Sequence, residues 1–337
     1  MKEVQLKWLK GKKVREKYRD KFTNPEIVKR IEQIENSPQM QSKLLLVKNG
    51  MKNNIINPFV LVIGAMFGFI ALSAMRAMLD IYSLLVMAAI VYFWGKYSEQ
   101  RRKQRRNDLA KSYIDNFLLP VLNEILPDTT IDYSKKIDLK AMKRLVPDSQ
   151  YYFGNCHIVF GDDYKTEFSN MQAYTETEDS EGHTRQTIDF CGQVLMAKFD
   201  TKINGHIRVV PIKKGKVLGV RNHGSYGKKT KIEKEIETES IEFNNSYAIY
   251  STDDFYTRLI LDPKIIELLN DWKEKMRVCL YMNEQYISVS FESNAFLFAL
   301  PQTKKQVDEL SLSTEYEKVR EKLSGFYSLI DIIGEKL

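Results

Sequence analysis

Two apolar stretches dominate the first third of this chain: FVLVIGAMFGFIALSAM at residues 59–75 and IYSLLVMAAIVYFW at residues 81–94. Between residues 58 and 97 the charged side chains are Arg76, Asp80 and Lys96. A helix needs roughly 17–25 apolar residues to cross a bilayer core of about 30 Å. The stretches therefore predict a two-helix transmembrane hairpin. The alternative is a buried helical hairpin in a soluble core, which we disfavour because such helices carry charge on one face.

The distribution of charge predicts how this hairpin would be oriented. The whole chain of 337 residues has a net charge of +7. Residues 1–57 carry a net charge of +8, residues 96–111 one of +5, and residues 112–337 one of -6. Since basic residues flank both sides of the hairpin, the positive-inside rule places both termini in the cytoplasm. We expect the lipid bilayer to be contacted by an aromatic and basic set: Trp94, Tyr97, Arg101, Arg102, Lys103, Arg105 and Arg106.

The sequence divides into four expected parts. They are a basic cytoplasmic helical region at residues 1–57, the transmembrane hairpin at 58–97, a helical stalk at 98–126 and a cytoplasmic domain at 127–337. In the last part, short runs rich in β-branched and aromatic residues alternate with turns, and no βαβ repetition is present. We therefore predict an α+β fold with a largely antiparallel sheet and flanking helices. The expected strands are 156–160, 167–177, 187–199, 206–211, 247–251, 256–261, 277–282 and 286–291.

Spacing of chemically active residues gives no catalytic motif. His157, His183, His206 and His223 form no HxxxH or HExxH pair, and the three cysteines show no CxxC spacing. No G-x-S-x-G nucleophile turn is present. The sequence thus predicts no catalytic residue, no metal ligand and no cofactor. Two carboxylates can act together as acid and base only if they lie close to the same reacting group. The positions of Asp253 and Asp254 in the sequence do not show this.

The loop KKGKVLGVRNHGSYGKKTK at residues 213–231 is the candidate anion-binding segment. Its glycines expose backbone amides among many cations, which suits a phosphate or a lipid headgroup. It lacks the GK[ST] ending of a nucleotide-binding loop, and a solvated insertion is the favoured alternative. The cations in question are Lys213, Lys214, Lys216, Arg221, Lys228 and Lys229.

The stretch from Glu239 to Phe298 resembles the bacterial DUF3137 family, whose function is unassigned. The resemblance is carried, in chain order, by Glu242-Phe243, Ile249–Asp253, Arg258–Leu261, Pro263–Leu269 and Leu280–Ile287, with Phe190-Cys191-Gly192 upstream. It implies two membrane spans before the domain, a bacterial inner-membrane location and a LemA-like membrane protein as partner. It implies no catalytic residues. Gly192 suits either a close approach of another part of the backbone or a β-bulge.

Together these observations favour a membrane-anchored cytoplasmic binding or scaffold module that recruits a protein or ligand. The alternative is a membrane-tethered enzyme acting on a phosphorylated or lipid substrate, with Asp253, Asp254, His206 or His157 converging in a pocket. The negative charge of residues 112–337 counts against nucleic acid as a partner. Small residues in the apolar stretches would also allow a homo-oligomer.

Overall fold

The chain divides into two compact units. The computed structural model describes residues 17–55, 66, 81–178, 182–214, 221–222, 226 and 229–336, with the backbone alone at 81–90, 213–214 and 221–222. The first unit, called the sheet unit, comprises Met1–Ile31, Val121–Ala299 and Tyr316–Leu337. The second, the helical unit, comprises Glu32–Pro120 and Leu300–Glu315.

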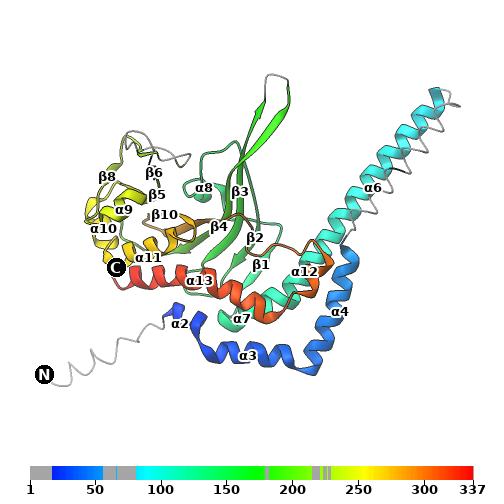
Figure 1. Ribbon diagram of the computed structural model, residues 1–337, viewed down its shortest axis with the longest axis horizontal. Coiled ribbons are helices and arrows are strands. Elements are labelled where there is room, and N and C mark those ends of the chain that lie inside the picture. Colours follow the sequence, from blue (N-terminus) through cyan, green and yellow to red (C-terminus); the bar gives the residue numbers. More distant parts are fainter. Residues whose placement is uncertain are drawn as a thin grey trace. The chain divides into compact units, whose positions relative to one another are not determined.

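A nine-stranded antiparallel sheet is the centre of the sheet unit (Figure 1). Its strand order is β1-β2-β3-β4-β11-β10-β5-β9-β8. The strands are β1 (Thr130–Asp132), β2 (Tyr151–Val159), β3 (Glu167–Glu178), β4 (Thr184–Lys198), β5 (His206–Pro211), β8 (Lys234–Ile236), β9 (Tyr247–Ser251), β10 (Arg277–Asn283) and β11 (Tyr286–Glu292). Two short strands, β6 (Lys213–Lys214) and β7 (Arg221–Asn222), pair with each other separately. The predicted antiparallel sheet is thus present.

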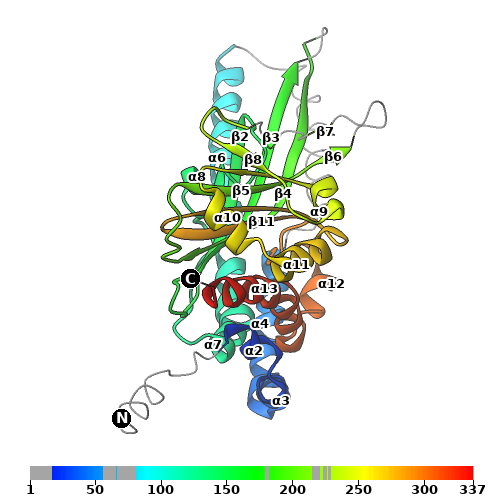
Figure 2. The same ribbon diagram turned by 90° about the vertical axis from the view of Figure 1, so that its left-hand side faces the viewer.

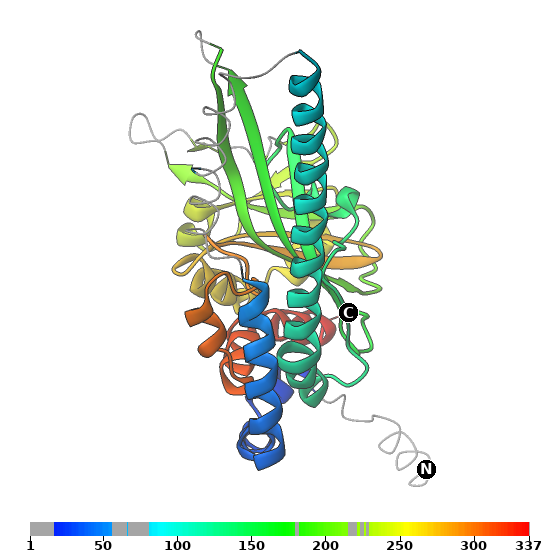
Figure 3. The ribbon, with the colours of Figure 1, turned by 90° about the vertical axis from the view of Figure 1, so that its right-hand side faces the viewer.

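Local sequence explains the hairpins that build this sheet. Asn283 begins the turn between β10 and β11, and its side-chain oxygen accepts hydrogen bonds from the backbone N–H groups of Gln285 and Tyr286, both at 3.0 Å. Strands β10 and β11 are buried along their central five residues, because both of their faces are covered. The longer hairpin of β3 and β4 extends beyond the other strands (Figure 3).

Helices cover the sheet in this unit. They are α2 (Tyr18–Thr23), α8 (Leu139–Met142), α9 (Ile241–Ser246), α10 (Asp254–Ile260) and α11 (Pro263–Lys273), with α7 (Leu119–Ile125) from Val121 and α13 (Leu312–Gly334) from Tyr316. Figure 2 shows α11 and α13 near one another. The buried Tyr327 of α13 stacks on Phe22 at 4.9 Å between ring centroids and donates a hydrogen bond to the carboxylate of Asp162. Helix α2 is thereby fixed to α13.

The helical unit contains α4 (Pro38–Asn54), α6 (Ile81–Tyr113) with the π-helical turn η1 (Ile114–Leu118), and α12 (Lys304–Asp308), together with the end of α3 (Pro25–Asn36) and the start of α13. Figure 3 shows α4 and α6 side by side. The carboxylate of Glu35 accepts hydrogen bonds from the backbone of Leu312 and Ser313, both at 3.1 Å, and so caps α13. Tyr113 donates a buried hydrogen bond of 2.6 Å to Glu315.

The predicted transmembrane hairpin is wrong. Within the described residues, no helix combines the length and the apolar character that crossing a bilayer requires. The second apolar stretch does lie in α6, but its 14 residues at 81–94 are followed closely by the charged stretch Glu99–Arg106 in the same helix. The first stretch lies outside the described residues except for Met66. With the hairpin, the prediction of a multi-pass inner-membrane protein with both termini in the cytoplasm is also corrected.

One expected strand is a helix. Residues 256–261 belong to α10 and to its C-cap, because the side chain of Asp253 accepts a hydrogen bond of 3.1 Å from the backbone N–H of Tyr256 and caps a helix at this point. Thr257 and Ile260, three residues apart, form the buried face of that helix, while Leu259 is exposed. Alternating hydrophobicity over a short run did not distinguish the two structures.

We expect Gly192→Ala to destabilise the sheet. A Cβ at Gly192 would lie 1.9 Å from the backbone oxygen of Phe291 on the paired strand, a distance that forces β4 and β11 apart. The close approach expected at Gly192 is therefore confirmed. The free energy of unfolding, measured in urea, should fall by about 2 kcal/mol or more. Gly95→Ala is the control, since no atom lies within 4 Å of its Cβ and alanine favours a helix. Equal effects of the two changes would contradict this account.

Candidate functional site

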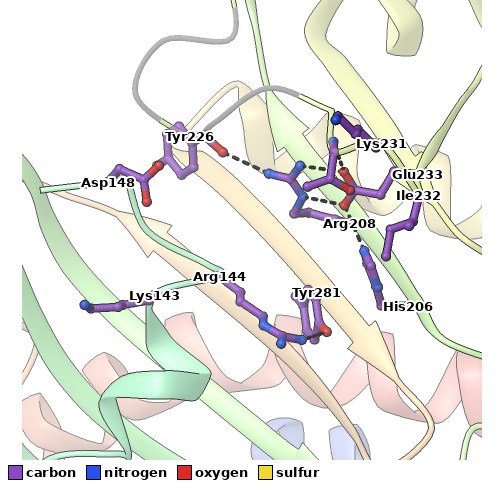
Figure 4. Close-up of a pocket in the computed structure, with 11 residues that line it drawn as sticks. Lys143, Arg144, Asp148, His206, Arg208, Tyr226, Lys231, Ile232, Glu233 and Tyr281 are labelled. Carbon is purple, nitrogen blue, oxygen red and sulfur yellow. Dashed lines mark hydrogen bonds and ion pairs between the residues drawn. The ribbon is translucent and has the colours of Figure 1, made fainter.

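A pocket of about 560 Å³ lies on one face of the sheet unit (Figure 4). Its size falls within the range of small-molecule sites. It is enclosed by β5 and β10, by the segment that follows α8, and by the segment that leads into β8. Its lining side chains are Lys143, Arg144, Asp148, His206, Arg208, Tyr226, Thr230, Lys231, Ile232, Glu233 and Tyr281.

Strand alternation places the central residues of this pocket. His206 and Arg208 are two residues apart on β5 and share one face, while Ile207 and Val209 are fully buried on the other. Arg208 lies directly opposite Tyr281 of β10 on one side and Tyr250 of β9 on the other. Its guanidinium carbon lies 4.9 Å from the centroid of the Tyr250 ring, a cation–π distance.

Glu233 holds the two basic residues of β5 in place. Its carboxylate accepts a hydrogen bond of 2.8 Å from His206 Nε2 and is bound bidentately by Arg208, with distances of 3.3 Å to Nε and 3.1 Å to Nη2. The backbone N–H of Thr230 donates to it at 2.7 Å. In Figure 4 both β5 side chains converge on this carboxylate. The side chain of Glu233 is 2% exposed and that of Arg208 12%, so the ion pair is largely removed from water.

The charge of Glu233 persists in spite of its burial. Burial raises the pKa of the carboxyl group, but the hydrogen bonds from Thr230, His206 and Arg208 and the charge of Arg208 lower it by more. The net result is a pKa lowered to about 2. Glu233 is therefore an anion at neutral pH, and its charge is neutralised by Arg208 rather than by a proton.

Other cations line the pocket around Tyr281. The Arg144 guanidinium carbon lies 5.0 Å from the Tyr281 ring centroid, and the same group donates a hydrogen bond to the Tyr281 hydroxyl (Figure 4). The ring of His206 stacks on Tyr281 at 5.7 Å. Lys143 and Lys231 also line the pocket, whereas Asp148 is the lining carboxylate besides Glu233. Because Arg208 and Glu233 compensate each other, the remaining charged side chains leave the pocket with a positive excess.

The structure places the predicted lipid-contact residues on a single helix. Trp94, Tyr97 and the cluster from Arg101 to Arg106 all belong to α6, where both aromatic side chains are exposed. Arg101 lies over the ring of Tyr97 at 4.8 Å, and Lys103 pairs with Glu99 at 2.8 Å. No residue of this group lines the pocket. Their contact with lipid, like the predicted domain limits, stays a prediction.

The predicted anion-binding loop is only partly described. Lys213 and Lys214 lie in β6 and Arg221 lies in β7, and the structure describes only the backbone of these three residues. Lys229 is exposed. Lys216 and Lys228 lie outside the described residues. Among the described residues of the range 213–231, those that line the pocket are Tyr226, Thr230 and Lys231. Anion binding by the six predicted cations stays a prediction.

The residues named for acid–base chemistry do not converge. Of these candidates only His206 lines the pocket. His157 pairs with Glu167 at 2.9 Å, Asp253 caps α10, and Asp254 pairs with Arg258 at 3.1 Å. Among the described residues, no three His, Cys, Asp or Glu side chains are grouped as a metal site would require.

Sequence analysis missed Arg144, Arg208, Glu233 and Tyr281. A signal for two of the pocket residues was present in HIRVVP at residues 206–211, where basic residues alternate with apolar ones. That pattern predicts two basic side chains on one face of a strand, which is unusual enough to mark a site. Glu233 and Arg144 gave no comparable signal, because they reach the pocket from irregular segments.

Comparison with known proteins agrees with the resemblance found in the sequence. Residues 188–335 match the family model described as "Protein of unknown function (DUF3137)". The matched range includes His206, Arg208, Tyr226, Glu233 and Tyr281 of the pocket, while Lys143, Arg144 and Asp148 precede it.

Curated proteins and solved structures add little. No curated protein matches the chain. A crystal structure of the mycobacterial trehalose monomycolate transport factor A, TtfA, is similar with a TM-score of 0.32 and 11% sequence identity, covering 60% of this chain and 88% of that chain. We draw no argument from a similarity of this degree.

Replacing Glu233 by glutamine should destabilise the protein by roughly 3–5 kcal/mol at neutral pH, because Arg208 would be left buried without a counter-charge. The folded pKa of about 2 lies below the ordinary value of 4.5. The stabilisation from this carboxylate is therefore fully present above pH 4.5 and is lost as the pH falls towards 2. The difference in unfolding free energy between wild type and Glu233→Gln, measured in urea, should shrink over that range.

The exposed Glu284, on the turn between β10 and β11, provides the control for this measurement. Glu284→Gln should leave the unfolding free energy within about 0.5 kcal/mol of wild type. A difference between wild type and Glu233→Gln that stayed constant down to the lowest pH would show that Glu233 is not held as an anion.

Proposed function

We propose that the sheet unit of this chain, which belongs to the DUF3137 family over residues 188–335, is a binding module. The pocket bounded by β5 and β10 recruits an organic ligand that carries a phosphate or carboxylate group. The ligand's anionic group binds among Arg144, Lys143 and Lys231, and its remaining part lies against Tyr281.

The observation that carries this proposal is the positive excess of a pocket whose internal ion pair is already satisfied. Arg208 is engaged by Glu233 and by the backbone oxygen of Tyr226, at 2.9 Å from Nη1, and so has a structural role. Among the other described lining residues, Asp148 is then the carboxylate that offsets the charges of Lys143, Arg144 and Lys231. An anionic ligand would relieve the repulsion between these cations, and a guanidinium group suits the planar geometry of phosphate and carboxylate.

The buried Arg208–Glu233 pair supports a preorganised site. Two charges taken from water cost several kcal/mol each, and apolar residues of similar volume often replace such a pair without loss of stability. Here the pair and His206 fix the floor beside Tyr281. Side chains held in place before a ligand arrives lose less conformational entropy on binding. Preorganisation of the pocket by the ion pair favours recruitment of a ligand over a purely structural role of the pair.

The alternative of an enzyme has less support. A hydrolytic or transfer reaction on a phosphorylated substrate would need a general base or nucleophile facing the bound group. Among the described lining residues, Glu233 is neutralised by Arg208, and His206 donates a hydrogen bond to that same carboxylate. We therefore keep binding, without catalysis, as the proposed function.

Calorimetric titration with inorganic pyrophosphate and with citrate tests the proposal, because one probe carries phosphate and the other carboxylate groups. We expect at least one of them to bind the wild type. Arg144→Gln and Lys231→Gln should each weaken that binding by about tenfold or more, the effect of losing one charge-assisted hydrogen bond.

Lys140→Gln is the matched control, since Lys140 is exposed on α8 and does not line the pocket. It removes the same charge and should leave the affinity unchanged. If neither probe binds, or if Lys140→Gln weakens binding as much as Arg144→Gln, the proposed pocket function is wrong.

A further inference from the structure

A second depression in the sheet unit lies away from the cationic pocket. It consists of two adjoining hollows of about 270 Å³ and about 580 Å³, which share Glu239, Pro263 and Ile266. We call the two together the acidic groove. It is bordered by the segment that continues β8, by the start of α9, and by α10 and α11. It has no lining residue in common with the cationic pocket.

The floor of the acidic groove is apolar. Ile236 at the end of β8, Ile249 of β9 and Leu261 after α10 are buried beneath it, and Ile266 of α11 is partly exposed along both hollows. The partly exposed side chain of Ile266 is the apolar surface that an aliphatic side chain of a bound molecule would remove from water. The turn after Thr238 holds the rim in place, because Asn244 Nδ2 donates to the Thr238 backbone oxygen at 2.7 Å.

The rim of the acidic groove is strongly negative. Seven carboxylates line the two hollows: Glu237, Glu239, Glu242, Asp262, Glu267, Asp271 and Glu274. Arg258 is the cation among the described lining residues, and it pairs with Asp254. Glu242 pairs with Lys273 at 2.7 Å, and Asp262 pairs with Lys336. Within the described part of the chain, Glu239, Glu267, Asp271 and Glu274 form no ion pair.

Helix α11 concentrates this charge on one of its faces. Glu267, Asp271 and Glu274 follow each other at intervals of four and three residues, so they are neighbours along the helix surface. Like charges at such spacing repel each other and destabilise the helix. Asn270 of the same helix also lines the groove, and its Oδ1 atom is buried without a hydrogen-bond donor among the described residues. A bound cation would relieve the repulsion between these carboxylates.

We propose that the acidic groove binds a segment of a partner protein in which lysine or arginine alternates with aliphatic residues. The aliphatic side chains would lie on Ile236, Leu261 and Ile266, and the basic ones would reach Glu239, Glu267 and Asp271. Charge complementarity selects this occupant, and the apolar floor distinguishes it from a free metal ion or polyamine. The described carboxylates are also not grouped as a metal site.

Fluorescence anisotropy with a labelled peptide in which lysine alternates with valine tests this inference on the full chain. Its twin carries glutamate in place of every lysine. We expect the lysine peptide alone to bind. The double variant Glu267→Lys/Asp271→Lys should weaken binding by about tenfold or more, and Ile266→Gln should weaken it as well.

The control variant Glu176→Lys/Glu178→Lys makes the same change of net charge on β3, away from the groove, and should bind as the wild type does. Thermal unfolding of each variant shows whether weaker binding comes from the loss of a contact with the peptide or from the loss of the folded structure. Equal binding by all variants would reveal non-specific attraction and overturn the proposal, as would no binding by the wild type. Carbodiimide cross-links from Glu267 or Asp271 to the peptide support it, whereas links only to lysines of the same chain or of a second copy overturn it.

Discussion

The ion pair between Arg208 and Glu233 is the constraint on which the cationic pocket depends. It joins β5, at the centre of one half of the sheet, to the irregular segment before β8. Removing two charges from water is unfavourable, and here the cost is offset by bidentate geometry, by Thr230 N–H and by His206. The pair and the hydrogen bond from Thr230 hold the segment around Lys231 against β5.

The sheet unit presents two surfaces of opposite charge. One is the pocket with Lys143, Arg144 and Lys231, and the other is the groove rimmed by carboxylates of α11. Residues 112–337 have a net charge of only -6, so the net charge of this region predicts neither the positive nor the negative surface. The fold brings basic residues from separate segments together at one surface and acidic residues from separate segments together at the other. A module with one site for an anionic ligand and another for a basic segment could connect the two partners.

The incorrect prediction of a transmembrane hairpin came from the composition of two short stretches. The apolar stretch 81–94 contains no charged residue, and its hydrophobicity alone resembled that of a spanning helix. In the structure it is the beginning of α6, a helix of 33 residues that also contains the basic cluster from Arg101 to Arg106. Length and apolar character must coincide in one helix for a span, and a sequence window that stops at Trp94 does not show what the helix contains beyond it.

The antiparallel sheet, its central hairpin and the start of α11 follow from residues close together in the chain. These are the β-branched and aromatic runs of β10 and β11, the turn at Asn283, and the Asp262 cap followed by Pro263. The helix at 254–260 was not predicted although the local cap Asp253 begins it, whereas both charged surfaces arise only from tertiary contacts. Arg144 and Tyr281 are 137 residues apart, and Arg208 and Glu233 are 25 apart. Such contacts are set by strand order and packing, for which local spacing carries no information.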